Sequence, residues 1–231
     1  MKKIFLSLLI FPLFLFGEYH GQFLQDKYMN EHFFKNKKQG VFVDIGAHLP
    51  VQDSNTYFFE NEMQWTGLCI DPHPVMFKQL KNKRTCKCLE VAVVPFTEGH
   101  QKFLQLDKLA GLSGLIGSYG EQDTARINKD SKLHGGKQQV INVKTVPINQ
   151  ILSTHKLFHI DFLSLDIEGG ELDILKALDF DTFFIDVITV ENNWEDAWHC
   201  EAKNSSIRKY METAGYRYVT RLGVDEVYKK I

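Results

Sequence analysis

Short apolar runs that each end at an acidic residue are the feature that most constrains how this chain can fold. Each run is rich in β-branched or aromatic residues and is followed by a polar or helix-like segment. The runs are 40–46, 65–72, 161–169 and 186–193, and their acids are Asp44, Asp71, Asp166 and Glu191. Parallel strands gather their carboxyl ends at one edge of an open sheet, where ligands bind. The pattern therefore predicts a largely parallel α/β sheet with an acidic rim.

Further segments extend this alternation. The run 86–94 predicts another strand of the same kind, and residues 216–223 and 224–230 predict a terminal antiparallel pair. A helix over 74–83 is predicted to begin at Pro74 and to carry an apolar stripe formed by Val75, Phe77, Leu80 and Lys81. The other predicted helices cover 56–63, 149–157, 170–180 and 204–214.

Residues 95–160 interrupt the simple alternation. They contain strand-like runs at 102–106 and 139–148, a Gly/Ser-rich stretch at 109–120 and a polar stretch that extends to Gly136. Two strands separated by so much polar chain predict an inserted hairpin with a mobile loop.

The size and charge of the chain limit its function classes. A chain of 231 residues is long enough for one hydrophobic core, and residues 20–231 contain no repeat, low-complexity tract or linker. We therefore expect a single domain over residues 18–231. Lys and Arg number 27 against 29 Asp and Glu, and this balance provides no broad positive field. Nucleic acid is accordingly not an expected partner.

Residues 1–17 have the composition of a targeting segment. Lys2 and Lys3 precede an apolar run over 4–16, which Pro12 interrupts. A helix that spans a bilayer needs about 20 apolar residues. A signal peptide is therefore favoured over an uncleaved or interfacial membrane anchor, and an ordinary buried helix is the third interpretation. The first two predict an exported or membrane-associated protein, and the third predicts a cytoplasmic one.

The four cysteines show no CxxC pair. Cys69, Cys86 and Cys88 lie in predicted strands, whereas Cys200 lies near a predicted helix start. Buried free thiols are the simplest interpretation. If the domain is exported, one disulfide between Cys69 and either Cys86 or Cys88 is the alternative.

The turn after the first strand bears on the class of ligand. Dinucleotide-binding turns use the pattern GxGxxG, which lets a pyrophosphate approach a helix N-terminus. Residues 44–50 read DIGAHLP, so Gly46 is the only glycine and a carboxylate precedes it. This argues against a nicotinamide-dependent oxidoreductase and suits a ligand with an ammonium group or hydroxyls, such as S-adenosylmethionine. Asp71 is then placed to accept hydrogen bonds from a ribose diol.

Several segments together carry a family resemblance. They are QFLQDKY (22–28), GVFVDIGA (40–47), SNTYFFE (54–60), WTGLCIDP (65–72), LSGL (112–115), IDFLSLDIEGGELDIL (160–175) and RLGVDEVY (221–228). From about Gln22 to the C-terminus, the chain resembles the FkbM-type S-adenosylmethionine-dependent methyltransferases. The resemblance implies the class I methyltransferase fold, in which a seven-stranded, mostly parallel sheet has helices on both faces and a terminal antiparallel hairpin.

The resemblance also assigns residues by motif position. It places Asp44, Gly46 and Ala47 at the methionine side of a cofactor pocket and Asp71 at the ribose, with Asp166 close to the transferred methyl group. One departure is that family members commonly have a glycine where this chain has Pro50. Proline lacks an N–H group and fixes φ, so we expect it to narrow the cofactor loop or to remove a backbone hydrogen-bond donor from it.

Methyl transfer to oxygen requires alignment of the two reactants and a base. The candidate catalytic residues are Asp166, Glu168 and His48, and Glu171 is a further candidate that a helix N-terminus would also favour. An alternative is that Asp166, Glu191 and Asn192 hold Mg²⁺, which would lower the pKa of a substrate hydroxyl. That arrangement resembles the catechol-type O-methyltransferases, with Glu in place of Asp.

The sequence therefore predicts a methyltransferase that uses S-adenosylmethionine to methylate a hydroxyl on a sugar or a small polyol-like metabolite. The alternative is a non-catalytic exported or membrane-associated binding protein that retains the fold. Pro50 and the N-terminal segment motivate this alternative, because export would separate the domain from the usual supply of cofactor. The oligomeric state is left open.

Overall fold

The computed structural model describes residues 17–192 and 206–231. The predicted targeting run at 4–16 and Cys200 therefore lie outside the described residues. Over the two described ranges, the chain contains no helix that is both long and apolar enough to cross a membrane.

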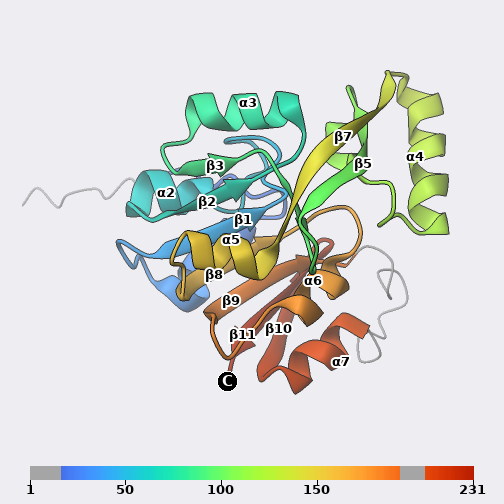
Figure 1. The fold of residues 1–231 in the computed structure, drawn as a ribbon. Helices are drawn as coiled ribbons and strands as arrows, with labels where there is room; N and C mark the ends of the chain where they lie inside the picture. The colour runs from blue at the N-terminus through green and yellow to red at the C-terminus, as the bar shows by residue number, and fades with distance from the viewer. Residues whose placement is uncertain (1–16, 193–205) are drawn as a thin grey trace, which may run out of the picture.

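A seven-stranded sheet forms the centre of the molecule. Its strands are β1 (Val41–Ile45), β2 (Thr66–Ile70), β3 (Lys87–Leu89), β8 (His159–Leu165), β9 (Phe184–Glu191), β10 (Tyr216–Leu222) and β11 (Asp225–Lys230). They lie in the order β10-β11-β9-β8-β1-β2-β3, as Figure 1 shows. Among the described strands of this sheet, β11 alone runs opposite to the others, because the chain returns from β10 to β11 in a hairpin. The predicted mostly parallel α/β sheet is thus confirmed.

Successive residues of the strands face opposite helical layers, because side chains alternate along a strand. In β1, Phe42 belongs to one apolar cluster, whereas Val43 and Ile45 belong to the other. The layer around Phe42 contains α1 (Gln25–Met29), the π-helix η1 (Asn30–Phe34), α2 (Tyr57–Met63) and α3 (Pro74–Lys83). The opposite layer contains α5 (Ile148–Thr154), α6 (Glu171–Ala177) and α7 (Ser206–Thr213).

The two strands predicted within residues 95–160 do pair antiparallel, and they belong to a second, smaller sheet. Its strands are β4 (Ala92–Val94), β5 (Gly99–Leu106), β6 (Gly114–Leu115) and β7 (Gln138–Pro147), in the order β4-β7-β5-β6. The predicted single strand 86–94 is wrong, because the chain leaves the main sheet at Glu90 and Val91 and enters the second sheet. In Figure 1, β5 and β7 extend away from the main sheet at the upper right.

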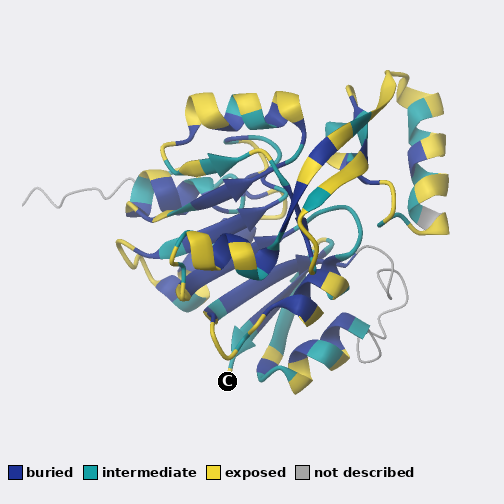
Figure 2. Ribbon diagram, viewed as in Figure 1, coloured by how far each residue is buried: buried dark blue, intermediate teal, exposed yellow. Residues whose placement is uncertain are grey.

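The polar stretch predicted to lie in a mobile loop is instead a helix, α4 (Glu121–His134). The Asp123 carboxylate caps its start by accepting the Gly120 N–H at 2.8 Å, and Arg126 and Asp130 form an i,i+4 pair. Ile127 is buried, and Figure 2 shows that much of the helix surface is exposed. A helix that is polar over most of its surface has a weak periodic signal, which is why the sequence pattern missed it.

Helix α3 has the predicted bounds, but its buried face matches the predicted stripe only at Leu80. Met76 and Leu80 are buried, whereas Val75 is 48% exposed and Lys81 is also exposed. The residues that face the sheet are therefore four apart and start one position later than predicted.

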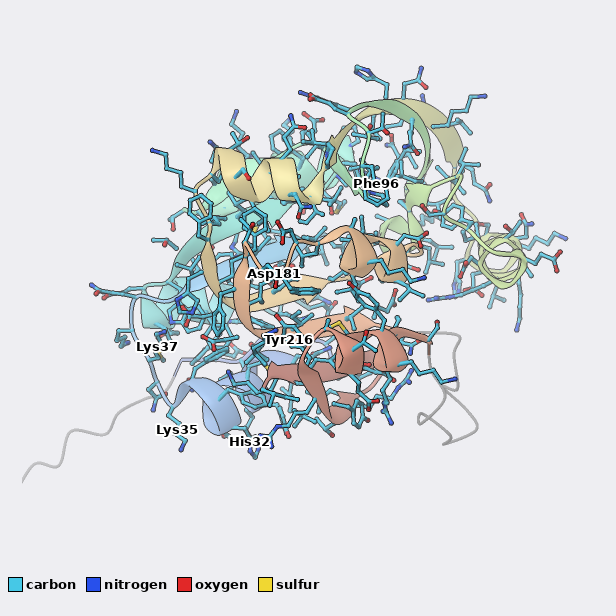
Figure 3. The ribbon with its side chains drawn as sticks, turned by 60° about the horizontal axis from the view of Figure 1, so that its bottom comes forward. His32, Lys35, Lys37, Phe96, Asp181 and Tyr216 are labelled. Carbon is cyan, nitrogen blue, oxygen red and sulfur yellow. The ribbon has the colours of Figure 1, made fainter. Side chains whose placement is uncertain are left out.

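The described cysteines are free thiols. Cys69, Cys86 and Cys88 form no disulfide, although the Sγ atoms of Cys69 and Cys86 are 3.5 Å apart. The simpler interpretation is thus confirmed for the free thiols but only partly for their burial, because Cys69 is buried and Cys86 and Cys88 are half-buried. At the other end of the sheet, the Tyr216 hydroxyl donates to the Ile185 carbonyl at 2.9 Å and ties β10 to β9 across β11 (Figure 3).

Candidate functional site

A cavity of about 430 Å³ lies at the carboxyl ends of the central strands. This volume is in the range of about 300–1,000 Å³ that is typical of small-molecule sites. The four predicted rim acids, which are Asp44, Asp71, Asp166 and Glu191, all line it. The second sheet and its connections contribute Phe103, Leu112 and Leu115, and α4 contributes Arg126. The structure thus brings the rim acids together and covers them with the inserted region.

Gly46 allows two strand ends to approach each other at the cavity edge. Its φ is +83°, and a Cβ atom at this position would lie 1.5 Å from the carbonyl oxygen of Asp166. The N–H groups of Gly46 and Ala47 both donate to the Ile70 carbonyl, at 2.9 and 3.2 Å. These two donors are therefore used within the fold, and the contribution of Gly46 is its missing side chain.

Two backbone donors orient the carboxylate of Asp71. The His48 N–H donates to Oδ2 and the His73 N–H donates to Oδ1, each at 2.8 Å. Burial raises the pKa of Asp71 to about 6, and the charge of Asp44 adds to this rise. Each carboxylate oxygen accepts more than one hydrogen bond, so both retain acceptor capacity toward the cavity.

Asp44 is buried at the end of β1 and is held by a residue that does not line the cavity. The Thr56 hydroxyl donates to its Oδ2 at 2.6 Å. Burial raises the pKa of Asp44, whereas Arg84 and the Thr56 hydrogen bond lower it. The neighbouring Asn55 lines the cavity, and its Oδ1 is buried without a hydrogen-bond partner among the residues that the structure describes.

Three carboxylates converge on the other side of the cavity. Oxygen atoms of Asp166, Glu168 and Glu191 all lie within 4.8 Å of one another. Burial and then the charge of Glu191 raise the pKa of Asp166 far above its usual range, and burial and then Asp166 raise that of Glu168 to about 8. Asp166 and Glu191 also share a hydrogen bond, which leaves a proton on Asp166. A cation placed here would relieve this repulsion.

The acids in the loop after β8 have different contacts and therefore different roles. Glu168 has a φ of +57° and its carboxylate lies 3.7 Å from Arg126. Glu171 instead accepts the N–H groups of Ile167 and Gly169, at 3.1 and 2.9 Å. The further candidate Glu171 therefore holds the loop, and Asp166 and Glu168 remain as the acids of this loop that face the cavity centre.

His48 lines the cavity beneath the second sheet. It has a φ of +46°, and its Cε1 atom lies 3.7 Å from the position that a Cβ on Gly111 would occupy. Gly111 belongs to the short 3-10 helix η2 (Ala110–Leu112). Burial, followed by the effect of His73, lowers the pKa of His48. The ring is therefore neutral near pH 7 and can accept a proton.

The predicted magnesium ligands are only partly brought together. Asp166 and Glu191 lie in the same cluster, and Asn192 lines an adjoining hollow that also contains Glu191 and Glu168. Glu168, which was predicted as a catalytic residue, is the third carboxylate beside Asp166 and Glu191.

Sequence patterns did not reveal the residues behind the cavity wall. Arg84 follows a lysine-rich helix and has no recognisable motif, yet its side chain is fully buried next to the loop after β1. Thr56 lies in a segment that was considered only as a helix start. Pro50 is buried, does not line the cavity, and accepts an Arg84 hydrogen bond at 3.4 Å through its carbonyl. Its missing N–H is therefore not a missing donor at the cavity surface.

The acid cluster predicts an unusual pH dependence of stability. Glu168 has a folded-state pKa of about 8 and Asp71 and Asp225 have values of about 6, whereas unfolded carboxylic acids titrate near 4. Between these values the folded state holds more protons than the unfolded state, so the free energy of unfolding falls as pH rises from about 5 to about 8. We expect a loss of roughly 6 kcal/mol over this range in denaturant titrations, more than half of it from Glu168.

Replacing Glu168 by glutamine is expected to flatten this curve above pH 6, because glutamine does not titrate. The exposed Glu212 offers a matched control, Glu212→Gln, whose curve is expected to follow that of the wild type. A Glu168→Gln curve as steep as that of the wild type would show that Glu168 is ionised in the folded protein at neutral pH.

Comparison with known proteins agrees with this geometry. The family model described as Methyltransferase FkbM domain matches residues 44–218, which is more than half of the chain. The matched range begins at Asp44 and extends into β10, so it includes every rim acid. A search of the curated proteins finds no match.

Proposed function

This chain belongs to the FkbM methyltransferase domain family, and from this premise we propose that it transfers a methyl group from S-adenosylmethionine to a hydroxyl of a small acceptor. The excess of acid in the cavity carries the proposal. Six acidic residues and a single arginine line it among the described residues: Asp44, Asp53, Asp71, Asp166, Glu168, Glu191 and Arg126. Such a cavity favours a cationic ligand, and S-adenosylmethionine carries a sulfonium and an ammonium group.

The residues present fit this cofactor. Asp71 presents two oriented acceptors, which suit the two hydroxyls of a ribose. Asp44 and the unpartnered Oδ1 of Asn55 suit an ammonium group, which needs several acceptors. The apolar side chains of Phe103 and Leu115 offer a surface for the adenine base.

When bound, S-adenosylmethionine supplies a methyl group activated by the positive sulfur atom. Asp166 is proposed to accept the proton of the acceptor hydroxyl. In the protein alone this carboxyl holds a proton that it shares with Glu191. A positive charge in the cavity lowers the pKa of both acids, so the shared proton is released to solvent when the cofactor site is filled, and the ionised Asp166 can then take the proton of the acceptor hydroxyl.

Glu168 and His48 complete the proposed acceptor side. Both line the cavity, and both expose acceptor atoms for the hydroxyls of a sugar or polyol-like molecule. The connection between β5 and β6 covers this side through Leu112 of η2, which limits the access of water to the reacting atoms.

A divalent cation is a second way to satisfy the same acids. Asp166, Glu168 and Glu191 would hold Mg²⁺ through carboxylate oxygens, which this hard ion prefers. The ion would lower the pKa of a bound hydroxyl and so reduce the need for a protein base.

Calorimetric titration of the protein with S-adenosylmethionine tests the proposal. We expect saturable binding with a Kd of roughly 1–100 μM, and weaker binding of S-adenosylhomocysteine because it lacks the sulfonium charge. Repeating the titration with MgCl₂ and with EDTA separates the two cations: equal affinities would argue against a metal. No heat and no thermal shift at millimolar S-adenosylmethionine would favour the alternative, a binding protein that retains the fold without catalysis.

A further inference from the structure

Arg84 lies behind the cavity wall and contacts the residues that hold Asp44. We propose that Arg84 is a positioning residue for cofactor binding, which acts through Thr56 to fix the Asp44 carboxylate and to keep it charged. This inference rests on the proposed function, because Asp44 is part of the proposed cofactor site. Arg84 itself does not line the cavity, so it would act without touching the cofactor.

The contacts of Arg84 connect three parts of the chain. Its Nε donates to Glu60 on α2, and one terminal nitrogen donates to the Pro50 carbonyl and the Ser54 hydroxyl, at 3.4 and 3.3 Å. Its other terminal nitrogen donates to the Thr56 hydroxyl at 2.9 Å. Arg84 therefore holds the loop after β1 against α2, directly beside Asp44.

Two hydrogen bonds connect Arg84 to Asp44 through the Thr56 hydroxyl, and the donor and the acceptor of each are fixed. A guanidinium group only donates, so the Thr56 oxygen must accept from Arg84. The single proton of the Thr56 hydroxyl then points to Asp44 Oδ2, at 2.6 Å. This arrangement requires an acceptor at Asp44 and therefore favours its ionised form. A threonine with no arginine behind it would be free to rotate and to accept from a protonated Asp44.

Asp44 depends on Arg84 and Thr56 to stay ionised, because its burial and a neighbouring acid favour the protonated form. Burial and the charge of Glu60 raise the pKa of Asp44, whereas Arg84 and Thr56 lower it. The titratable and charged groups that interact with Asp44 are Glu60 on α2, Cys69 on β2, Asp71 after β2 and Arg84 after α3. Arg84 is the cation in this set, so its removal leaves a buried carboxylate among acids and thiols.

If Arg84 served only as a structural salt bridge to Glu60, substituting it would have different measurable effects. Glu60 already pairs with Arg84 and also accepts the N–H groups of Thr85 and Cys86. If Arg84 were purely structural, its substitution would lower the stability of the protein but would leave the pH dependence of ligand binding unchanged. The pH profile therefore separates a positioning role from a structural one.

The test is calorimetric titration with S-adenosylmethionine at pH 6, 7 and 8. The variants are Arg84→Met combined with Glu60→Gln, which avoids an unpaired buried Glu60, and Thr56→Val, which keeps the salt bridge. In both we expect weaker binding, by about 10-fold or more at pH 6, with a smaller loss at pH 8. The midpoint of the affinity–pH curve is expected to rise by about one pH unit, and proton release on binding at pH 7, measured in buffers of different ionisation enthalpy, is expected to increase.

Two controls accompany these variants. Thr56→Ser keeps the hydroxyl and is expected to restore the wild-type profile, and Arg217→Met removes an exposed arginine and is expected to change nothing. If the wild type binds S-adenosylmethionine and Thr56→Val has an unchanged pH profile, the role assigned to Arg84 is wrong. If the wild type does not bind, the proposed function itself fails, so the two failures are distinguishable.

Discussion

Replacing Asp71 by asparagine is expected to weaken the binding of S-adenosylmethionine by about 100-fold or more. The carboxylate accepts one backbone N–H on each oxygen, from His48 and from His73. Asparagine has one acceptor oxygen, so its amide group must face one of these N–H donors. Hydrogen bonds to charged groups contribute about 1.5–3 kcal/mol each, and 1.4 kcal/mol corresponds to a tenfold change in affinity. The substitution would disturb both the loop and the proposed ribose site.

The control for this experiment is Asp181→Asn, in the turn after α6. Asp181 is an exposed acid that does not line the main cavity, and it is labelled in Figure 3. Its titration is expected to match that of the wild type. Calorimetry measures the affinity, and circular dichroism verifies that Asp71→Asn remains folded. An affinity within about threefold of the wild type would place the ribose elsewhere.

Alanine at position 46 is expected to lower the free energy of unfolding by about 3–5 kcal/mol, which is at the upper end for a single substitution. The left-handed conformation of Gly46, with a φ of +83°, disfavours any residue with a Cβ atom. The added Cβ would also lie 1.5 Å from the Asp166 carbonyl oxygen. The ends of β1 and β8 would have to separate, and the hydrogen bond from the Asp166 N–H to the Ile45 carbonyl would be lost.

Gly117→Ala is the matched control for this substitution. A Cβ atom on Gly117 would have no heavy atom within 4 Å, and the residue has no positive φ. Its effect on stability is expected to stay within about 0.5 kcal/mol. Denaturant unfolding of both variants, followed by circular dichroism, measures the difference. Equal unfolding midpoints would contradict the close approach of the two strands at Gly46.

Local patterns predicted most of the main sheet. The apolar runs around Asp44, Asp71, Asp166 and Glu191 became β1, β2, β8 and β9, because a buried parallel strand needs a continuous apolar run over a few residues. The terminal pair β10 and β11 was also predicted. The failures were the split of 86–94 between two sheets and the helix α4. Neither is encoded by a local period, since the first depends on where two sheets meet and the second has a polar surface.

The sequence predicted the acids of the candidate site but not the residues that surround them. Asp44, Asp71 and Asp166 share a position at a strand end, and one rule of sheet geometry brings them together. No such rule of sheet geometry predicts that Arg84 and Asn55 lie near these acids. Arg84 reaches Glu60, 24 positions earlier in the chain, and Asn55 reaches Ser164, 109 positions later. Such pairs depend on how α2, α3 and β8 pack.

The sequence by itself determined the order of the main strands' apolar runs, the acids at their ends and the family to which the chain belongs. These features are local, because strand periodicity and motif spacing act over a few residues. Only the tertiary structure decided which residues enclose the acids. The second sheet covers the cavity, Arg84 supports Asp44 from behind, and Glu168 joins Asp166 and Glu191. Charge and burial at these positions depend on neighbours that are distant along the chain, and packing brings those neighbours into contact.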